Sequence, residues 1–499
     1  MRLALGALLF VGLALPIAAA DDKANDDTGG RSADRSVRMN ILFILSDDHR
    51  SDFLSCAGHP VLRTPAIDSL ARRGTRFENA FVTTAICAAS RATILTGLYE
   101  STHGFTFREG PLDDDELAAS YPAQLREAGY RTGFYGKFGV SVPGAGQLSG
   151  HTIVDRKLGP PAEWTARMFD DFEHIHRQPY FKNQPDGTVR HTSDLIGDRG
   201  VGFIRSAADG EQPWCLSISF NAGHGEDSDK TRHYPYPPSE AGLYANASIP
   251  EPRYPIDEWT KLPEFFHTSI QRDRFFWRWD TPEKYHNNMI DYLRLLSGMD
   301  RNIGRMLEAL DLTGQADRTA VIFIGDNGYY AASRGFAGKW SHHEESLRVP
   351  LVVALPDGPE QVRREDALNL DMAPTILDLA GVESPKAYQG RSLRAIVEGS
   401  TPEDWRGDFF IEHRMRRDDI PKYEGVRAGS LKYARYVEHL GDADDTDGDG
   451  VAVGEFLHDL DADPSERQNY AADPAYRDRL DQLRARTDEY LTDLKPPMR

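Results

Sequence analysis

The chain is poor in cysteine and in long apolar runs. Its 499 residues include three cysteines, Cys56, Cys87 and Cys215, too few for a disulfide-rich scaffold. A bridge between Cys56 and Cys215 is one alternative, but Cys215 lies in an apolar run of the kind that buries free thiols, so we expect both to be free. After residue 20, no apolar run is long enough to cross a membrane as a helix.

Positive charge is also scarce. The chain has 78 acidic and 58 basic residues, for a formal net charge of −20. Such a surface repels nucleic acid and anionic membranes, and we expect neither as a partner. An anionic ligand would have to bind at a local patch of positive charge, which screening over about 8–10 Å permits.

The first twenty residues have the features of a secretory signal peptide. Arg2 precedes an apolar core over residues 3–15, and small residues follow at 18–20. We predict cleavage after Ala20, a polar and disordered leader over residues 21–38, and a mature protein that is secreted or periplasmic. An uncleaved N-terminal anchor is the alternative.

The following 380 or so residues alternate short apolar runs with helical patterns. Continuous apolar strands separated by helices predict an α/β fold, in which a large mixed, mostly parallel sheet is sandwiched by helices. In such folds ligands bind beyond the carboxyl ends of the strands. The apolar runs span residues 41–45, 132–135, 214–220, 321–324 and 351–355, and the helical patterns include 67–73 and 292–310.

The pattern of apolar and polar residues changes after Ser400. Shorter alternating segments at 425–436 and 455–460, followed by a helical pattern over about 475–494, predict a smaller C-terminal antiparallel sheet with a packing helix. We therefore divide the chain after the leader into a main domain, residues 39–400, and a C-terminal subdomain, residues 401–499.

Polar side chains follow the strand-like runs. Either acidic pair alone is typical of a helix cap or a turn, but two such pairs at equivalent strand ends offer oxygen ligands that suit Ca²⁺ or Mg²⁺ rather than zinc. The residues are Asp47 and Asp48 after the first run, Lys137 after the second, His224 after the third, and Asp326 and Asn327 after the fourth.

Residues 87–97 read Cys-Ala-Ala-Ser-Arg-Ala-Thr-Ile-Leu-Thr-Gly. The thiol of Cys87 stands just before an expected helix start, with Ser90 as the expected cap and Arg91 directed at any anion held there. This pattern indicates a nucleophile beside an anion site. A lone cysteine near a helix is more often an inert buried thiol.

The same segment resembles the signature of the type I sulfatases of the alkaline phosphatase superfamily, Cys-x-Pro/Ala-Ser-Arg followed by Leu-Thr-Gly. Further segments resemble this family in the same order along nearly the whole chain after the leader, an arrangement that chance rarely produces. They are the Ser-Asp-Asp of 46–48, the Thr-Pro-Ala-Ile-Asp-Ser-Leu-Ala of 64–71, the Asp-Asn-Gly of 326–328, the Arg-Val-Pro of 348–350, the Asp-Met-Ala-Pro-Thr of 371–375, and the Asp-Leu of 459–460 with the Asp-Pro-Ser-Glu of 463–466.

The resemblance implies that Cys87 is oxidised to formylglycine by a formylglycine-generating enzyme. The hydrated aldehyde would attack sulfur, while a protonated His224 or Lys339 assists the leaving alcohol. One cation, Ca²⁺ or alternatively Mg²⁺, would be bound by Asp47, Asp48, Asp326, Asn327 and residue 87. The residues expected to line the sulfate site are Arg91, Lys137, His224 and Lys339.

Three departures from the family pattern stand out. Ala89 replaces the commoner proline, which the modification signature tolerates. Gly223 and Gly225 flank His224 where the family has a Pro-His-x-Pro frame. The family's Gly-Lys-Trp-His reads Gly-Lys-Phe-Gly at 136–139, so a histidine that contacts formylglycine is missing at Gly139.

Two weaker features remain. The acidic segment 445–450 looks like part of a calcium loop, but Glu455 comes one residue too early for an EF-hand, and we prefer a solvated hairpin tip. The aromatic and basic stretch 265–279 fits either stacking on sugar rings near a cleft or a core or subunit contact.

The sequence thus predicts an enzyme that hydrolyses sulfate esters, on sulfated carbohydrate. One alternative is a phosphodiesterase or phosphonate monoester hydrolase of the same superfamily, and another is an inactive protein that binds sulfated glycans. Two other classes are disfavoured. A thiol hydrolase that uses unmodified Cys87 would not need the acidic pairs as metal ligands, and a two-zinc phosphatase would need histidine ligands that are not evident in the sequence.

Overall fold

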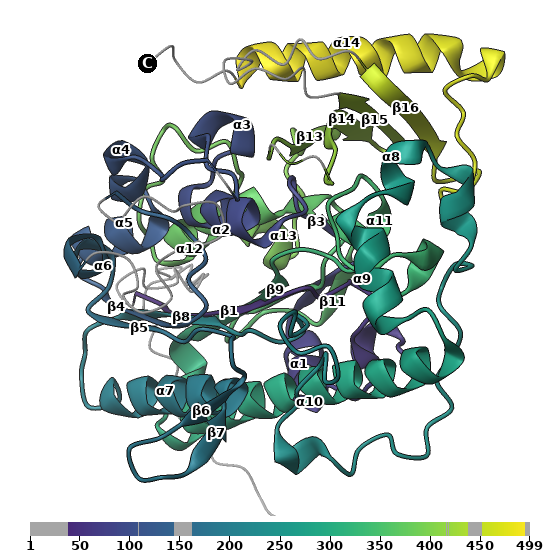
Figure 1. Cartoon of the computed structure of the whole chain (residues 1–499). Helices are drawn as coiled ribbons and strands as arrows, with labels where there is room; N and C mark the ends of the chain where they lie inside the picture. The colour runs from purple at the N-terminus through teal and green to yellow at the C-terminus, as the bar shows by residue number, and fades with distance from the viewer. Residues whose placement is uncertain are drawn as a thin grey trace, which may run out of the picture. The chain divides into compact units, whose positions relative to one another are not determined.

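The five apolar runs form strands β1, β4, β8, β9 and β10 of an eight-stranded mixed sheet (Figure 1). The computed structural model describes residues 38–107, 109–143, 162–415, 417, 419–437 and 452–494, and residues 38–499 form one compact unit. The strand order is β11 (Gln361–Arg363), β2 (Thr75–Phe77), β10 (Leu351–Ala354), β9 (Thr319–Gly325), β1 (Asn40–Ser46), β8 (Trp214–Ser219), β4 (Arg131–Gly136) and β5 (Asp171–His174).

Strand β1 lies in the middle of this sheet and pairs in parallel with β8 and β9. Its side chains alternate between two cores, because successive residues of a strand point to opposite faces. Ile41 and Phe43 belong to one apolar core, and Leu42 and Ile44 to the other. The run is apolar throughout because both faces are covered, as in most parallel sheets.

Helices cover both faces (Figure 1). Helices α1 (Pro65–Ala71), α7 (Thr192–Ser206) and α10 (Pro282–Leu312) pack on the Leu42 face, and α2 (Cys87–Thr96), α5 (Tyr121–Glu127) and α12 (Met372–Leu379) on the Ile41 face. The long helix α10 starts where Thr281 accepts a hydrogen bond from the Lys284 N–H and Pro282 occupies the first turn, a combination that favours a helix start.

The C-terminal part forms a four-stranded antiparallel sheet in the order β13 (Asp408–His413), β14 (Lys422–Ala428), β15 (Leu431–Val437) and β16 (Ala452–Asp459). Helix α14 (Arg477–Asp493) lies across it (Figure 1). Side chains of this sheet and helix, such as Phe410 and Leu480, belong to the same apolar core as Ile41. The predicted fold class is confirmed.

Shorter elements complete the described part of the chain. Two small sheets pair β3 (Ala80–Phe81) with β12 (Ala367–Leu368), and β6 (Phe181–Asn183) with β7 (Val189–His191). The remaining α-helices are α3 (Glu100–His103), α4 (Asp114–Ala118), α6 (Ala162–Met168), α8 (Glu264–His267), α9 (Ile270–Arg278), α11 (Glu344–Leu347) and α13 (Arg394–Val397).

Two sequence predictions fall outside the described residues: the signal peptide with nearly all of the leader, and the acidic segment 445–450. Among the helices that are described, none combines the length and the apolar character needed to cross a membrane. Cys56, Cys87 and Cys215 are free thiols.

Candidate functional site

The candidate site lies where β1, β9, β8 and β4 end. These four strands run parallel, so their carboxyl ends share one edge of the sheet. Asp47 and Asp48 follow β1, Asp326 and Asn327 follow β9, and Lys137 follows β4. We call this group, with Cys87 at the start of α2, the carboxylate edge.

Potential metal ligands converge at the carboxylate edge. One ligand atom from each of Asp47, Cys87 and Asp326 lies within 4.8 Å of the other two, and the same holds for Asp47, Asp48 and His224. Asp47, Asp326 and Asn327 are fully buried, and Asp48 is 2% exposed. Buried carboxylates at this spacing need positive charge beside them.

Three basic side chains supply part of that charge. Lys137 Nζ lies 2.5 Å from Asp47 Oδ2, Arg91 Nε lies 2.8 Å from Asp326 Oδ2, and Lys339 Nζ pairs with Asp48 Oδ1. Burial alone would raise the pKa of Asp47, but the charges of Lys137 and Arg91 hold it below its ordinary value. Burial, together with the neighbouring Asp47 carboxylate, raises the pKa of Asp326.

Two acceptor atoms at this edge nevertheless have no donor. Asp47 Oδ1 and Asn327 Oδ1 are buried and find no hydrogen-bond partner among the described residues, although Asn327 uses its Nδ2 to donate to Asp48 Oδ1 at 2.7 Å. A buried acceptor without a donor costs about 1–3 kcal/mol. Carboxylate and amide oxygens are the ligands of hard cations, so these atoms fit a bound Ca²⁺ or Mg²⁺.

Helix α2 brings Cys87 to this edge. The helix begins at Cys87 itself, with Ile86 as the N-cap residue, so the prediction that Ser90 caps the helix is wrong. Ser90 lies in the first turn, where its hydroxyl accepts a hydrogen bond from Asn369 Nδ2. Arg91 is buried, and besides its contact with Asp326 it donates to the Lys137 carbonyl at 2.7 Å.

His224 is held by the loop after β8. Its Nε2 lies 3.7 Å from Asp48 Oδ2, and its Nδ1 lies 2.8 Å from the Gly225 carbonyl oxygen. The Tyr180 hydroxyl donates to the carbonyls of Asn221 and His224, at 2.8 and 2.5 Å. These bonds fix the loop without the prolines that the family pattern places there.

Gly139 has no room for the missing histidine. Its φ is +74°, and a Cβ built there would lie 2.8 Å from Arg91 Cδ, so any side chain would be strained. Two histidines that the sequence prediction missed line the same cavity as Cys87: His174, the last residue of β5, and His176, in the loop that follows. His174 Nδ1 accepts the Phe138 N–H at 3.1 Å, and burial lowers its pKa to about 4.

A cavity of about 180 Å³ opens beside Cys87, more than ten times the roughly 15 Å³ that one water molecule needs. Lys137, His224 and Lys339 line it together with His174 and Trp340. The structure therefore brings every predicted site residue except Arg91 to the carboxylate edge or to this cavity, and Arg91 bonds to Asp326 of the edge.

For most of its aromatic residues, the stretch 265–279 makes the core contact that was one of the two sequence-based alternatives. Phe266, Phe275 and Trp279 are buried in the two apolar cores, and Phe276 is half exposed. It is a basic residue of the stretch, Arg274, that lines the cavity.

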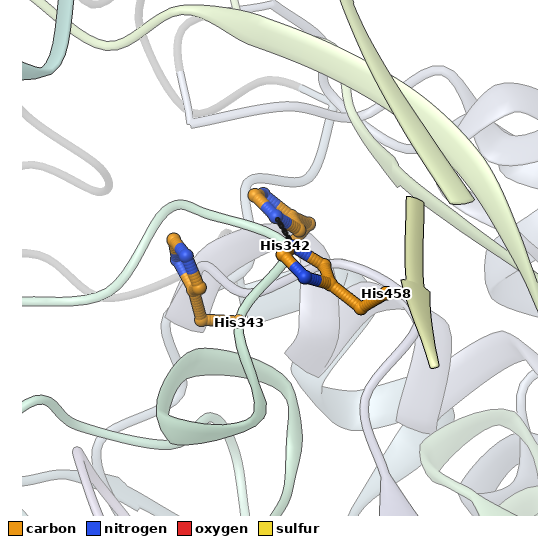
Figure 2. A group of neighbouring side chains, drawn as sticks. All are labelled: His342, His343 and His458. Carbon is orange, nitrogen blue, oxygen red and sulfur yellow. Dashed lines mark hydrogen bonds between the residues drawn. The ribbon is translucent and has the colours of Figure 1, made fainter. Parts of the chain in front are cut away.

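Three further buried histidines come close together (Figure 2): His342 and His343, directly before α11, and His458, on β16. We call them the histidine cluster. His342 Nε2 and His458 Nε2 lie 3.0 Å apart, while their ring centres are 5.2 Å apart and the rings are 12° from parallel. The two nitrogens therefore point at each other, as in an N–H···N hydrogen bond.

Hydrogen bonds extend from both ends of this pair. The Tyr436 hydroxyl donates to His342 Nδ1 at 2.7 Å, and His458 Nδ1 donates to the Gln468 carbonyl at 3.0 Å. Zinc–nitrogen bonds are about 2.0–2.1 Å long, so a zinc ion does not fit on the line between these nitrogens. His343 Nδ1 bonds to the Tyr330 hydroxyl at 2.6 Å, while its Nε2 has no partner among the described residues.

Comparison with known families agrees with the site. A sulfatase family model matches residues 39–382, and a model of the C-terminal region of N-sulphoglucosamine sulphohydrolase matches residues 333–493. An N-acetylglucosamine-6-O-sulfatase of Bacteroides thetaiotaomicron is 26% identical, over 90% of this chain and 86% of its own length. A multifunctional alkaline phosphatase superfamily protein, PehA, of Trinickia caryophylli is 28% identical, over 88% and 92%.

Solved structures share the fold. A protein in complex with its substrate, D-glucosamine-2-N,6-O-disulfate, has a TM-score of 0.72 and 23% identity, over 92% of this chain and 98% of that chain. A phosphonate monoester hydrolase of Silicibacter pomeroyi has a TM-score of 0.72 and 21% identity, over 91% and 96%. Because the sulfatase model spans more than half of the chain and the whole carboxylate edge, this chain belongs to the sulfatases, the sulfuric ester hydrolases of the alkaline phosphatase superfamily.

Proposed function

We propose that the protein hydrolyses sulfate esters of carbohydrates, with formylglycine made from Cys87 and one divalent cation, most simply Ca²⁺. The observation that carries the proposal is the convergence of Asp47, Cys87 and Asp326 within 4.8 Å beside acceptor oxygens for which the described part of the chain offers no donor. When present, the formylglycine supplies a hydrated aldehyde as nucleophile, and the cation polarises the sulfate oxygens.

The charge balance of the edge supports an anionic substrate. Three basic side chains, Arg91, Lys137 and Lys339, face the carboxylates of Asp47, Asp48 and Asp326. Their charges balance, so a divalent cation held by the carboxylates and Asn327 would leave an excess of positive charge. Such an excess stabilises the negative charge that develops on the sulfate oxygens in the transition state.

The remaining role is proton transfer to the leaving alcohol. His224 lies beside Asp48 and lines the cavity, and we assign it this proton. Arg91, Lys137 and Lys339 then bind the sulfate oxygens. Because Gly139 carries no side chain, we assign to His174 the imidazole contact that the family pattern places at Gly139.

Carbohydrate is proposed as the substrate class because the relatives include an N-acetylglucosamine-6-O-sulfatase and an ulvan-active sulfatase, that of Formosa agariphila. Sulfate release from a panel of defined sulfated mono- and oligosaccharides tests this. We expect kcat/KM for at least one sulfated sugar to exceed that for an aryl sulfate. Turnover of aryl sulfate alone would contradict the carbohydrate assignment.

A second candidate is phosphonate monoester or phosphodiester hydrolysis, since a phosphonate monoester hydrolase shares the fold. The two activities are separated by comparing kcat/KM on a sulfate monoester and a phosphonate monoester with the same leaving group. A larger value for the phosphonate would favour this candidate.

We further propose export of the protein and maturation of Cys87 by a formylglycine-generating enzyme. The Ala-rich apolar N-terminus supports export, and one relative is an extracellular sulfatase homolog of Drosophila melanogaster.

A further inference from the structure

A second group of basic side chains lines the cavity beside the carboxylate edge. Arg177, which follows β5, and Arg274, on α9, both line the cavity that contains Cys87. Arg274 Nη2 lies 3.0 Å from Asp227 Oδ2, and Arg177 Nη2 lies 3.6 Å from the same oxygen. Arg278 pairs with the other oxygen, Oδ1. One carboxylate is thus shared by three guanidinium groups.

The third arginine belongs to the protein interior. Arg278 is 1% exposed, and a Cβ built on Gly225 would lie 3.1 Å from its Cζ, so the chain packs directly on this guanidinium. The charge of Arg278 neutralises that of Asp227. The pKa of Asp227 is held well below its ordinary value, because the arginine charges outweigh the effect of burial. Two positive charges, those of Arg177 and Arg274, are left over.

Two acidic groups lie nearby. Asp419 pairs with Arg417. Glu226 accepts hydrogen bonds through Oε1 from the neutral donors Gln178, at 2.8 Å, and Ser228, at 2.7 Å, and its charge acts on Arg177, so it offsets part of the positive charge there. Arg274 Nε is buried and has no hydrogen-bond partner among the described residues. Burial and the charge of Arg278 lower the pKa of Arg274, although Asp227 opposes them. Arg274 therefore lies where an additional anion would be stabilised.

One aromatic ring connects this group to the carboxylate edge. The Arg274 guanidinium carbon lies 4.9 Å from the ring centre of Trp340, and Lys339 Nζ lies 5.4 Å from the same ring. Trp340 also lines the cavity. Two cationic groups therefore lie close to one indole ring, so a sugar bound against Trp340 would have both within reach.

We propose that Arg177 and Arg274 form a second anion-binding subsite, which holds a second sulfate or a carboxylate of the sugar whose sulfate is hydrolysed. The proposal rests on the proposed function, because it takes the sulfated sugar as the ligand of the cavity. Arginine binds both oxyanions through paired N–H donors, so the two groups share one recognition chemistry.

Calorimetric binding and kcat/KM, measured on matched sugars, test the subsite. One pair is glucosamine 6-sulfate and glucosamine N,6-disulfate, and the other is a 2-O-sulfated hexose and a 2-O-sulfated hexuronate. Hydrogen bonds to charged groups contribute about 1.5–3 kcal/mol, so we expect the doubly anionic member of at least one pair to bind roughly 10–100-fold more tightly. The pair that shows the preference identifies the second anion.

Arg274→Gln should reduce this preference at least tenfold, and Arg274→Lys should restore part of it. Arg177→Gln is the second variant if Arg274→Gln fails to fold; because Arg177 Nη1 also contacts His224 Nδ1, only a change in the preference between the two members of a pair, and not a loss on both, counts for the subsite. Arg190→Gln is the matched control, since Arg190 is 41% exposed and pairs with Asp198. Equal binding of both members of each pair by the unaltered enzyme, or equal losses on both in Arg274→Gln, would overturn the subsite. If no sugar released sulfate, the proposed function would be contradicted and the subsite would not, because the binding measurements test the subsite without turnover.

Discussion

The carboxylate edge and the histidine cluster both gather buried atoms that could bind a metal, but they use their lone pairs differently. At the edge, Asp47 and Asn327 each keep an oxygen with no donor among the described residues. In the cluster, His342 and His458 bond to each other, and Tyr436 and the Gln468 carbonyl bond to their remaining nitrogens, so that among the described residues only Nε2 of His343 is left without a partner there. Proximity of ligand atoms is therefore a weak criterion for a metal site, and the number of unsatisfied acceptors is a better one.

The comparison is tested most strongly at Asp326. Asp326→Ala removes a carboxylate of the edge and the partner of Arg91, so we expect loss of bound metal and a fall in kcat/KM of roughly 10⁴-fold, equivalent to about 5 kcal/mol of transition-state stabilisation. Sulfate release and elemental analysis of the purified protein measure the two effects. Tightly bound metal in a folded Asp326→Ala variant would remove the distinction between the two regions.

A change at His224 should have a smaller and more selective effect. If His224 protonates the leaving alcohol, His224→Ala should lower kcat/KM on a sugar sulfate by about 10²-fold or more, and much less on an aryl sulfate, whose leaving group departs without a proton. Lys339→Ala should impair both substrates, because its charge binds the sulfate. Equal losses on both substrates for His224→Ala would make this histidine a sulfate ligand and Lys339 the better candidate for the acid.

The histidine cluster should matter for stability and not for metal content. His458→Leu leaves the His342 Nε2 and the Gln468 carbonyl without partners, which costs about 1–3 kcal/mol of unfolding free energy. Urea unfolding and elemental analysis measure the outcome. Loss of one metal ion per chain in this variant would mean that the cluster, too, binds a cation.

The pH dependence of stability gives the smallest expected effect. Burial lowers the pKa of His458 to about 3 and holds that of His342 well below 6.5, so both are neutral in the folded protein. Unfolded histidines bind protons near pH 6.5. Stability is therefore complete above about pH 6.5 and falls as the pH drops toward the folded values, by up to about 1.4 kcal/mol per pH unit for each histidine. Unfolding between pH 7.5 and 5.5 should show a shallower slope for His458→Leu than for the unaltered protein, and an unchanged slope would contradict this.

Much of the fold was predictable because buried parallel strands leave short but unbroken apolar runs in the sequence. The runs at 41–45 and 321–324 form β1 and β9, which pair in parallel. The polar pairs that follow them therefore lie at the same edge of the sheet. Strand β5 was missed, because its residues, Asp171–His174, are all partly exposed and mostly polar. That β10 runs antiparallel to β9 was also not predictable, since pairing depends on contacts far along the chain.

The site was predictable where a residue type implied a chemistry, and not where packing decided. Asp47 and Asp326 were predictable because carboxylates bind hard cations, and Cys87 because a thiol is a nucleophile. The histidines that reach the cavity in place of Gly139 come from the missed strand β5 and the loop after it. Arg274 was visible in a stretch noted for its aromatic residues, but only the structure shows that Arg274 lines the cavity while Phe275 and Trp279 lie in the core.

The central claim is that the carboxylate edge serves a formylglycine nucleophile at position 87. The direct measurement is mass spectrometry of the tryptic peptide 77–91 from enzyme purified with full sulfatase activity. We expect this peptide to carry the aldehyde or its hydrate in place of the Cys87 thiol, in proportion to the specific activity of each preparation. Fully active enzyme that contains only cysteine at this position would contradict the account.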